Sequence, residues 1–262
     1  MPELPEVEAA AEQLRGAVLG RVVARVRVLH PTHRRQLPPG AQRALAGRRI
    51  DRIERRAKIQ LVHFDDDSVL EVHFRMTGDW AFTRGETDAP AHARLRLEMT
   101  DGVVVHLVDS RALAVVRRHA PGTWAPPPLG PEPLTDDFTT DGFGAVLASR
   151  RAPIKTVLLD QRVVAGVGNI YAAEALWVAR IHPATPAQAL SMARVRRLRD
   201  AIREVLQQAP TGRYYARVGA DAVEAWRVYD AEGGACPRCR TSIARLVQGG
   251  RSSYYCPRCQ RR

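Results

Sequence analysis

The sequence predicts an α+β protein of several domains: a β-sandwich or barrel led by a helix, then a helical domain, then a short cysteine-bearing ribbon. Three observations support this prediction. The hydrophobic period changes from helical to alternating near residue 21, and it becomes helical again after residues 120–133, which contain six prolines. All four cysteines lie between residues 236 and 259. The 262 residues are enough for two modest domains with separate cores.

The N-terminal domain, residues 1–120, should begin with a helix. Apolar residues recur at helical spacing from Leu4 to Leu14, before Gly16, and Pro5 suits a first helical turn. From Arg21 the apolar residues alternate, which is typical of strands with one buried face. Strands are expected within 22–28, 69–76 and 94–99, with turns at 65–68 and 101–102.

Residues 121–135 are interpreted as a linker because proline interrupts both helices and strands. The pattern then predicts a helical domain over 136–232 and a separate ribbon over 233–262. Expected helices cover about 142–149, 153–160, 169–179 and 187–208, and the ribbon strands are expected at 243–247 and 252–255.

The charge balance favours a polyanionic partner. The chain has 40 Lys plus Arg against 28 Asp plus Glu, giving a net charge of +12 and a pI near 10.5. Nucleic acid is the leading interpretation, and nonspecific binding to ribosomes or membranes is the alternative. Because no uncharged apolar stretch of about 18 residues occurs and the N-terminus is acidic, we expect a cytoplasmic protein.

Three basic residues are candidates for specific roles. Lys58 and Lys155 are the only lysines among 40 cationic residues, so each marks a position that needs a compact ammonium or a group able to lose a proton. Arg251 follows Gly249-Gly250, a tight turn from which a guanidinium could bind a phosphate through two hydrogen bonds. Chance retention of the lysines and a solvated surface arginine are the alternatives.

The cysteines form two pairs, Cys236-Pro-Arg-Cys239 and Cys256-Pro-Arg-Cys259, separated by 16 residues. This spacing is typical of a tetrahedral four-cysteine zinc ribbon, in which the metal supplies folding free energy that so short a segment lacks. Two disulfides or reactive thiols are the alternative. Since the thiolates would fill all four ligand positions, the single zinc ion should be structural.

The start of the chain is a candidate nucleophile. Removal of Met1 would expose the secondary amine of Pro2, whose ordinary pKa of about 7.7 to 8 leaves part of it neutral. A neutral secondary amine can attack the anomeric carbon of a nucleoside, and the iminium that forms promotes elimination of the sugar phosphates. Of the neighbouring Glu3 and Glu6, one could act as an acid toward the sugar and the other could order the site. A chain that begins Met-Pro-Glu without such chemistry is the alternative.

Five motifs occur together and in order: Met1-Pro-Glu-Leu-Pro-Glu-Val-Glu8, Arg55-Arg-Ala-Lys58, Leu129-Gly-Pro-Glu-Pro-Leu134, Gly166-Val-Gly-Asn-Ile-Tyr-Ala-Ala-Glu174 and the terminal ribbon. Because of these motifs the chain resembles the formamidopyrimidine-DNA glycosylase and endonuclease VIII family. The motifs are closer to those of the formamidopyrimidine-DNA glycosylase branch. The resemblance implies an N-terminal β-sandwich, a helix-two-turns-helix domain and a C-terminal zinc finger. It also implies a monomeric base-excision repair enzyme that acts on double-stranded DNA, removing 8-oxoguanine, formamidopyrimidines or oxidised pyrimidines and then cleaving the strand by β,δ-elimination.

The resemblance assigns roles to individual residues. By analogy Pro2 forms the Schiff base with the sugar of the flipped nucleotide and Glu3 donates a proton. Lys58 assists β-elimination, and Arg251 assists the following δ-elimination. The DNA contacts implied by the family are His73, Met76, His92, Arg111, Leu113, Arg151, Lys155 and Asn169.

Each of these contacts has a plainer alternative. Asn169 could be an ordinary helix cap, and His73 and His92 could be strand or loop histidines without chemistry. Tyr171 and Trp177 are predicted to be core residues and not base-stacking residues.

Two departures from the family pattern leave the substrate open. Asp109-Ser-Arg-Ala-Leu-Ala114 replaces the family's usual Asp-Pro-Arg-Arg-Phe-Gly, so Leu113 stands where a stacking phenylalanine is expected. Loss of aromatic stacking removes about 1 to 3 kcal/mol per base in single-strand systems. The segment 210–226 also looks shorter than the loop that covers the everted base in the branch acting on oxidised purines. Oxidised purines and oxidised pyrimidines both remain candidates.

Three hypotheses follow. The first is a bifunctional glycosylase and abasic-site lyase. The second is a lesion-selective or structure-selective DNA-binding protein of the same fold with little turnover, which the altered 109–114 motif motivates. A plain zinc-ribbon binding module ranks last, because it would need neither a free N-terminus nor Lys58.

Overall fold

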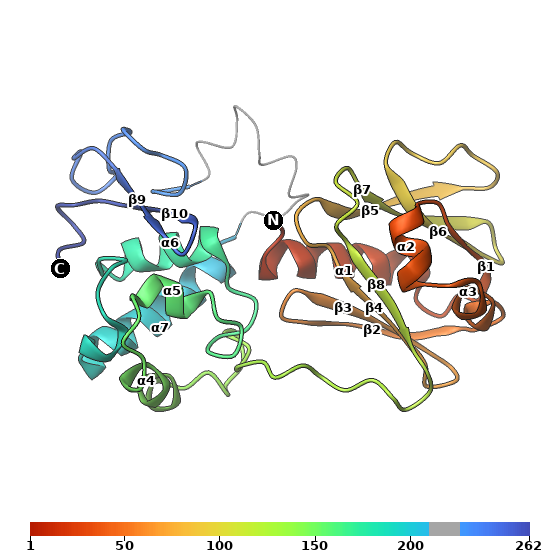
Figure 1. Cartoon of the computed structure of the whole chain (residues 1–262), viewed down its shortest axis with the longest axis horizontal. Helices are drawn as coiled ribbons and strands as arrows, with labels where there is room; N and C mark the ends of the chain where they lie inside the picture. The colour runs from red at the N-terminus through yellow and green to blue at the C-terminus, as the bar shows by residue number, and fades with distance from the viewer. Residues whose placement is uncertain (210–225) are drawn as a thin grey trace. The chain divides into compact units, whose positions relative to one another are not determined.

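The protein is described here by a computed structural model that covers residues 1–209 and 226–262. It forms two compact units, Met1–Pro126 and Pro127–Arg262 (Figure 1). The first contains two β-sheets and the second contains helices followed by a two-stranded ribbon with four clustered cysteines. The predicted α+β fold class is therefore confirmed. None of the helices in the described part of the chain combines the length and apolar character of a membrane span.

The first unit is a sandwich of two antiparallel four-stranded sheets, with strand orders β1-β6-β7-β5 and β2-β3-β4-β8. Antiparallel sheets that each bury one face pack against one another through alternate side chains. The strands are β1 (Val23–Val28), β2 (Ile50–Arg56), β3 (Ile59–Phe64), β4 (Val69–His73), β5 (Gly78–Arg84), β6 (Ala93–Met99), β7 (Val103–Asp109) and β8 (Val115–His119).

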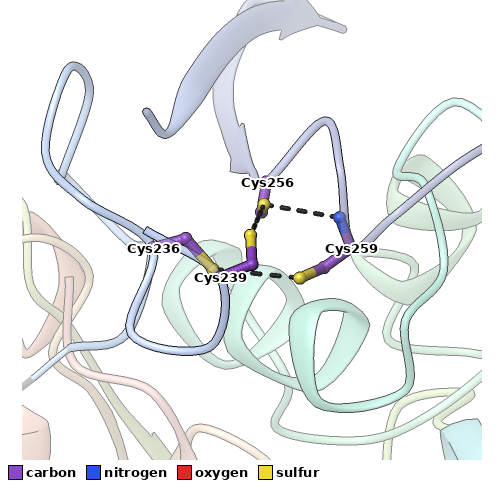
Figure 2. A group of neighbouring side chains, drawn as sticks. All are labelled: Cys236, Cys239, Cys256 and Cys259. Atoms are coloured by element: carbon purple, nitrogen blue, oxygen red, sulfur yellow. Dashed lines mark hydrogen bonds between the residues drawn. The ribbon is translucent and has the colours of Figure 1, made fainter. Parts of the chain in front are cut away.

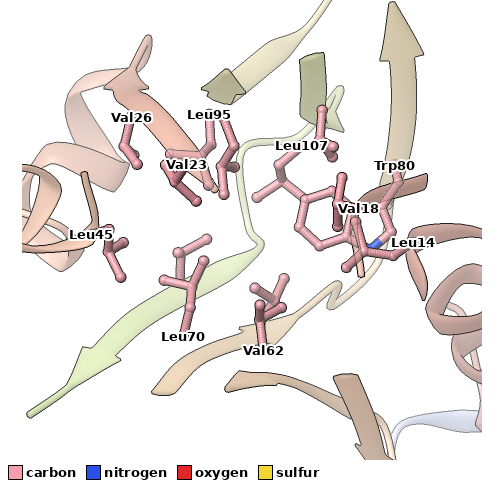
Figure 3. Close-up of a cluster of buried hydrophobic side chains, with 14 of the residues drawn as sticks. Leu14, Val18, Val23, Val26, Leu45, Val62, Leu70, Trp80, Leu95 and Leu107 are labelled. Carbon is pink, nitrogen blue, oxygen red and sulfur yellow. The ribbon is translucent and has the colours of Figure 1, made fainter. Parts of the chain in front are cut away.

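One apolar core joins the two sheets and the leading helix (Figure 3). Helix α1 (Leu4–Val18) places Leu14 and Val18 on this core, where they meet Trp80 of β5 and residues of both sheets. The predicted leading helix is confirmed, and α1 continues through Gly16 to Val18 because this last buried turn still packs on the core. The core therefore fixes the helix whose first residues carry the candidate nucleophile.

Three further differences from the sequence prediction concern local structure in this unit. The short helices α2 (Pro31–Gln36) and α3 (Pro39–Leu45) were not foreseen, since each is too short for an apolar period to show. Each begins at a proline, as a first helical turn allows. The strand expected over 69–76 ends at His73, because the chain turns back and Gly78 N–H donates to the Phe74 carbonyl at 3.0 Å.

The second unit contains α4 (Thr140–Ala148), α5 (Ile154–Leu158), α6 (Asn169–Val178), the 3-10 turn η1 (Ala187–Ala189) and α7 (Met192–Gln207). The prediction of one helix over 187–208 was wrong, because Leu190 and Ser191 adopt extended conformations that separate η1 from α7. Helix α6 is buried from Ile170 to Trp177, and these residues include Tyr171 and Trp177. Both aromatic residues are thus core residues, as predicted.

The C-terminal ribbon consists of β9 (Ala244–Gln248) and β10 (Arg251–Tyr255), paired antiparallel. Gly249 and Gly250 have φ values of 54° and 73°, the left-handed conformations that a tight two-residue hairpin needs. The predicted strands are confirmed to within one residue. Six buried residues form the core around the ribbon: Ala173, Trp177, Val228, Cys236, Ile243 and Cys256.

Candidate active site and zinc centre

The first residues of the chain are enclosed at the N-terminal end of α1. Pro2 is buried, and the side chains of Glu3 and Glu6 are only 1% and 5% exposed. The Glu6 carboxylate accepts the backbone N–H of Glu3 at 2.9 Å, which closes the chain onto the first helical turn. A buried carboxylate with this partner holds the backbone of Glu3 in one orientation.

Burial changes the chemistry of an amine at this position. It lowers the pKa of the Met1 ammonium from 8.0 to about 6, against the opposing charges of Glu3 and Glu6. The charges of Lys58 and Arg111 lower this pKa further. Charged side chains from two distant turns therefore act on the chain start, and an amine there is mostly neutral at pH 7.

Lys58 is held in the turn between β2 and β3. Ala57 adopts a left-handed conformation with φ of 52°, and its carbonyl accepts a hydrogen bond from Arg55 Nη1 at 3.1 Å. Arg55 Nε also donates to Glu8 of α1 at 2.6 Å, and Arg15 Nη2 donates to the same carboxylate at 2.9 Å. Glu8 thus ties the helix behind the chain start to the turn that carries the buried Lys58.

His73 is a neutral residue in this region. Burial, with the charges of Arg75 and Lys58, lowers its pKa to about 4. Its Nδ1 accepts the backbone N–H of Arg75 at 2.9 Å, which leaves the ring proton on Nε2. His73 can therefore offer a phosphate an N–H donor but not a positive charge at pH 7.

The other candidate DNA contacts of the first unit lie in exposed loops. Met76 follows β4, His92 precedes β6, and Arg111 and Leu113 follow β7. Met76 is 38% exposed and Leu113 is 44% exposed, so both apolar side chains face solvent. The structure brings these residues to neighbouring loops, and their contact with DNA remains a prediction.

Lys155 and Asn169 of the second unit converge on one backbone carbonyl. Lys155 Nζ donates to Ser252 O at 2.7 Å, and Asn169 Nδ2 donates to the same oxygen at 3.1 Å. Lys155 is only 1% exposed, whereas Arg251, next to Ser252, is exposed. Asn169 does not cap α6, because the N-cap residue is Gly168. These bonds anchor the start of β10, and phosphate binding by Lys155 and Asn169 remains a prediction, as it does for the exposed Arg151.

The four cysteines fit one zinc ion. Their Sγ atoms all lie within 4.8 Å of one another, with 3.4 Å between Cys239 and Cys256 and 4.0 Å between Cys236 and Cys259 (Figure 2). A tetrahedral ion with Zn–S bonds of about 2.3 Å separates its ligands by about 3.8 Å, which matches these spacings. All four thiols are free of disulfides. The predicted single structural zinc ion is thereby supported, and the zinc ion leaves no ligand position for chemistry.

Two buried residues outside the four ligands support this centre. Trp177 Nε1 of α6 donates to Cys236 Sγ at 3.4 Å, and the Arg238 guanidinium lies 3.8 Å from the Trp177 ring centroid. Glu174, also on α6, is 3% exposed and accepts the backbone N–H groups of residues 227, 228 and 229 at 2.9 to 3.0 Å. The role of Glu174 was not predicted from the sequence, in which its only signal is its place at the end of the Gly166–Glu174 motif.

Three stretches of the chain match known domain families. Residues 1–116 match the formamidopyrimidine-DNA glycosylase N-terminal domain, 129–214 its H2TH domain, and 233–262 the zinc finger found in FPG and IleRS. Across 99% of this chain and 98% of the relative, it is 40% identical to the formamidopyrimidine-DNA glycosylase of Chloroflexus aurantiacus. The chain belongs to the formamidopyrimidine-DNA glycosylase family.

Other members of the formamidopyrimidine-DNA glycosylase family agree over the full length. The enzyme of Rhizorhabdus wittichii is 41% identical, with complete coverage of both chains. A MutM bound to DNA containing carbocyclic 8-oxo-G superposes with a TM-score of 0.89 at 31% sequence identity. The Lactococcus lactis enzyme bound to oxidised-pyrimidine DNA superposes with a TM-score of 0.89 at 30% sequence identity. Both similarities cover the whole of each chain. The predicted sandwich, helix-two-turns-helix and zinc-finger architecture is thus confirmed. The expected shortened segment 210–226 lies outside the described residues except for Trp226.

Proposed function

We propose that this protein is a DNA glycosylase that removes oxidised bases from double-stranded DNA and an abasic-site lyase that then cleaves the strand. The observation that carries the proposal is the burial of Pro2, Glu3 and Glu6 at the chain start, where enclosure lowers the pKa of the Met1 ammonium to about 6 although the charges of Glu3 and Glu6 raise it. A solvated amine would remain largely protonated at neutral pH.

The proposed chemistry uses the amine that removal of Met1 would expose on Pro2. The neutral nitrogen attacks C1′ of the everted nucleotide, and the base leaves with the electrons of its glycosidic bond. The N–H proton that the nitrogen then loses neutralises the departing base. Glu3 gives its proton to the ring oxygen as the sugar opens, and the nitrogen becomes a cationic iminium without bearing a proton. Loss of a C2′ proton then expels the 3′ phosphate, and Lys58 is proposed to assist this elimination and to hold the phosphate.

The second unit is proposed to bind the DNA backbone. Arg251 is exposed at the ribbon turn, and we assign it to the δ-elimination that expels the 5′ phosphate. Relatives have been crystallised with 8-oxo-G, abasic-site and oxidised-pyrimidine DNA, so both classes of oxidised base are candidate substrates. We propose that the protein acts in the cytoplasm, on the DNA of the nucleoid.

A lesion-selective DNA-binding protein with little turnover is the second candidate. Leu113, which is 44% exposed, stands where the family carries a stacking phenylalanine, and this favours weaker insertion into the duplex. The two candidates differ in one outcome, because only the enzyme forms a covalent bond with deoxyribose.

Borohydride trapping tests the proposal directly. Tag-free protein is incubated with duplexes containing 8-oxoguanine, thymine glycol or an abasic site, and the reduced adduct is located by peptide mass spectrometry. We expect the adduct on Pro2 in wild-type protein and in the control Pro5→Ala, which changes the neighbouring proline in the first turn of α1. Absence of an adduct on all three duplexes, with DNA binding retained, would establish the second candidate.

Glu3→Gln separates the two proposed steps. The amide cannot donate the proton that opens the sugar of an intact nucleoside, whereas a preformed abasic site already exists partly as the open aldehyde. We expect base excision to fall at least about a hundredfold while trapping at the abasic site remains measurable, a difference within the 10² to 10⁴ range of general acid catalysis. Equal loss of both would contradict the role given to Glu3.

A further inference from the structure

Four side chains that we propose to contact the opened duplex come from three separate loops of the first unit. Met76 lies in the turn between β4 and β5, His92 lies just before β6, and Arg111 and Leu113 lie between β7 and β8. All four side chains are exposed. Three independently mobile loops could not present them in one arrangement, so something must hold the loops in register.

The carboxylate of Asp109, the last residue of β7, bonds to two of these loops. Its Oδ1 accepts the hydroxyl of Thr77, next to Met76, and also the backbone N–H of Arg111 at 3.2 Å. Its Oδ2 accepts the backbone N–H of Ala114 at 2.7 Å. Asp109 is only 1% exposed, so water does not compete for these bonds.

The backbone of Asp109 bonds to the third loop. Its N–H donates to the carbonyl of His92 at 3.0 Å. Its own carbonyl accepts Nε of Arg94 at 2.7 Å and the N–H of Ala112 at 3.2 Å. One buried residue is therefore hydrogen-bonded to all three loops.

The same loops hold backbone conformations that need outside support. Arg75, His92 and Ala112 are non-glycine residues with φ between 52° and 64°, the left-handed region that ordinary residues avoid. Gly78 closes the first loop so tightly that a Cβ there would lie 2.7 Å from the Phe74 carbonyl oxygen. Conformations of this kind persist only where surrounding bonds fix them, and in two of the three loops those bonds lead to the Asp109 side chain.

We propose that Asp109 is a positioning residue that holds Met76, His92, Arg111 and Leu113 in one arrangement. Met76, Arg111 and Leu113 then enter the duplex together as the base leaves the stack, while His92 contacts a phosphate. The inference rests on the proposed function of these loops. Because the Asp109 side chain is buried, its proposed role is to position its neighbours and not to contact the DNA. In this chain such positioning matters more than usual, because Leu113 inserts without the stacking that phenylalanine would add.

Thr77→Val is the central test, because valine keeps the shape of threonine and removes only the hydroxyl that joins Met76's loop to Asp109. Thr77→Ser restores the hydroxyl and serves as the rescue. Thr83→Val is the matched control. Thr83 lies in β5, the strand that begins just after Thr77, and its hydroxyl contacts His106 Nε2 at 3.0 Å, not Asp109. Asp109→Asn is the stronger variant. Each carboxylate oxygen of Asp109 accepts a backbone N–H, so the amide NH2 of asparagine would face another hydrogen-bond donor.

Two quantities are measured, each at a temperature equally far below the melting temperature of every variant. The first is the rate of base excision divided by the rate of nicking at a preformed abasic site, where little base extrusion is needed. The second is the fluorescence of 2-aminopurine beside the lesion in the bound complex, which rises as the stack opens. We expect Thr77→Val to lower the rate ratio about tenfold, as loss of one hydrogen bond to a carboxylate predicts, and to lower the fluorescence rise. Thr77→Ser and Thr83→Val should keep both at the wild-type value.

An unchanged ratio and unchanged fluorescence in Thr77→Val would overturn the inference, and so would equal effects of Thr77→Val and Thr83→Val. If Asp109→Asn does not fold, the threonine series still decides. The fluorescence measurement needs no turnover, so it separates the two proposals: wild-type protein that opens the stack without excising a base would refute the proposed function alone.

Discussion

The two units present their candidate DNA-binding groups by different physical means. In the first unit, two sheets and α1 share a large apolar core, and the loops above it are held by buried hydrogen bonds to Asp109. The zinc finger contributes only Cys236, Ile243 and Cys256 to its buried apolar cluster, whose other fully buried members lie in α6 and at Val228, and four thiolates converge on the space for one ion. The comparison shows that a short segment can hold an arginine in place without a core of its own when a metal replaces it.

Loss of one zinc ligand should give the largest effect and should separate the two units. Cys239→Ser leaves three thiolates, so we expect zinc content to fall well below one ion per chain and DNA affinity to fall about a hundredfold. Metal content, DNA binding and amide hydrogen exchange are the measurements. Amides of β9 and β10 should lose protection while those of β6 and β7 keep it. Loss of protection in both units would show that the zinc ion does not stabilise the finger alone.

Truncation in the sandwich core should be costly in a different way. Leu107 on β7 is fully buried, so Leu107→Ala should lower the free energy of unfolding by about 2 to 5 kcal/mol in urea denaturation. Leu113→Ala is the control, because its side chain is exposed and should change stability by only about 0.5 kcal/mol. Equal losses from the two variants would mean that the core does not carry the stability of this unit.

The terminal amine of the first unit should make trapping at an abasic site depend on pH. Burial lowers the pKa of the Met1 ammonium to about 6, and Pro2 is likewise buried, so we expect the Pro2 amine to have a lowered pKa as well. Since the protonated amine cannot attack, trapping at an abasic site should fall about tenfold per pH unit below the pKa. Lys58→Met should move the midpoint upward, because the charge of Lys58 lowers this pKa. A wild-type midpoint near pH 8 would contradict the enclosed amine.

Glu8 tests whether α1 and the Lys58 turn act together. Glu8→Gln removes the charge that binds both Arg55 and Arg15, so we expect the trapping rate to fall about fivefold, as partly exposed charge-assisted bonds predict. Glu12→Gln is the matched control, an exposed carboxylate on the same helix. Identical rates in the two variants would show that the Arg55–Glu8 contact does not position Lys58.

The smallest expected effect concerns the bond from α6 to the metal centre. Trp177→Phe keeps an aromatic ring but loses the N–H that donates to Cys236 Sγ, so zinc transfer to a chelator should be about threefold faster, a small effect for an outer-sphere partner. Trp226→Phe is the control, since that ring packs edge-on against Tyr171 and Tyr229. Equal rates would mean that the indole merely fills space.

The zinc finger was the part of the molecule most open to prediction from sequence. The two cysteines of each pair lie three positions apart, so the spacing alone determines that two thiolates can reach one ion. The strands of the ribbon were also placed to within one residue, because the glycine pair marks the turn. By contrast, α2 and α3 were missed, and η1 and α7 were merged, because one or two helical turns leave no readable period.

Sequence by itself determined the family, the fold class, the zinc ligands and the nucleophile hypothesis, since each rests on residues close together or on motifs in order. Tertiary structure alone decided what surrounds them: the buried amine between Glu3 and Glu6, the shared carbonyl of Ser252, and the bonds gathered on Asp109. Thr77 and Asp109 are 32 residues apart, and Lys155 and Ser252 are 97 apart. Contacts over such separations follow from sheet register and core packing, which no local pattern encodes.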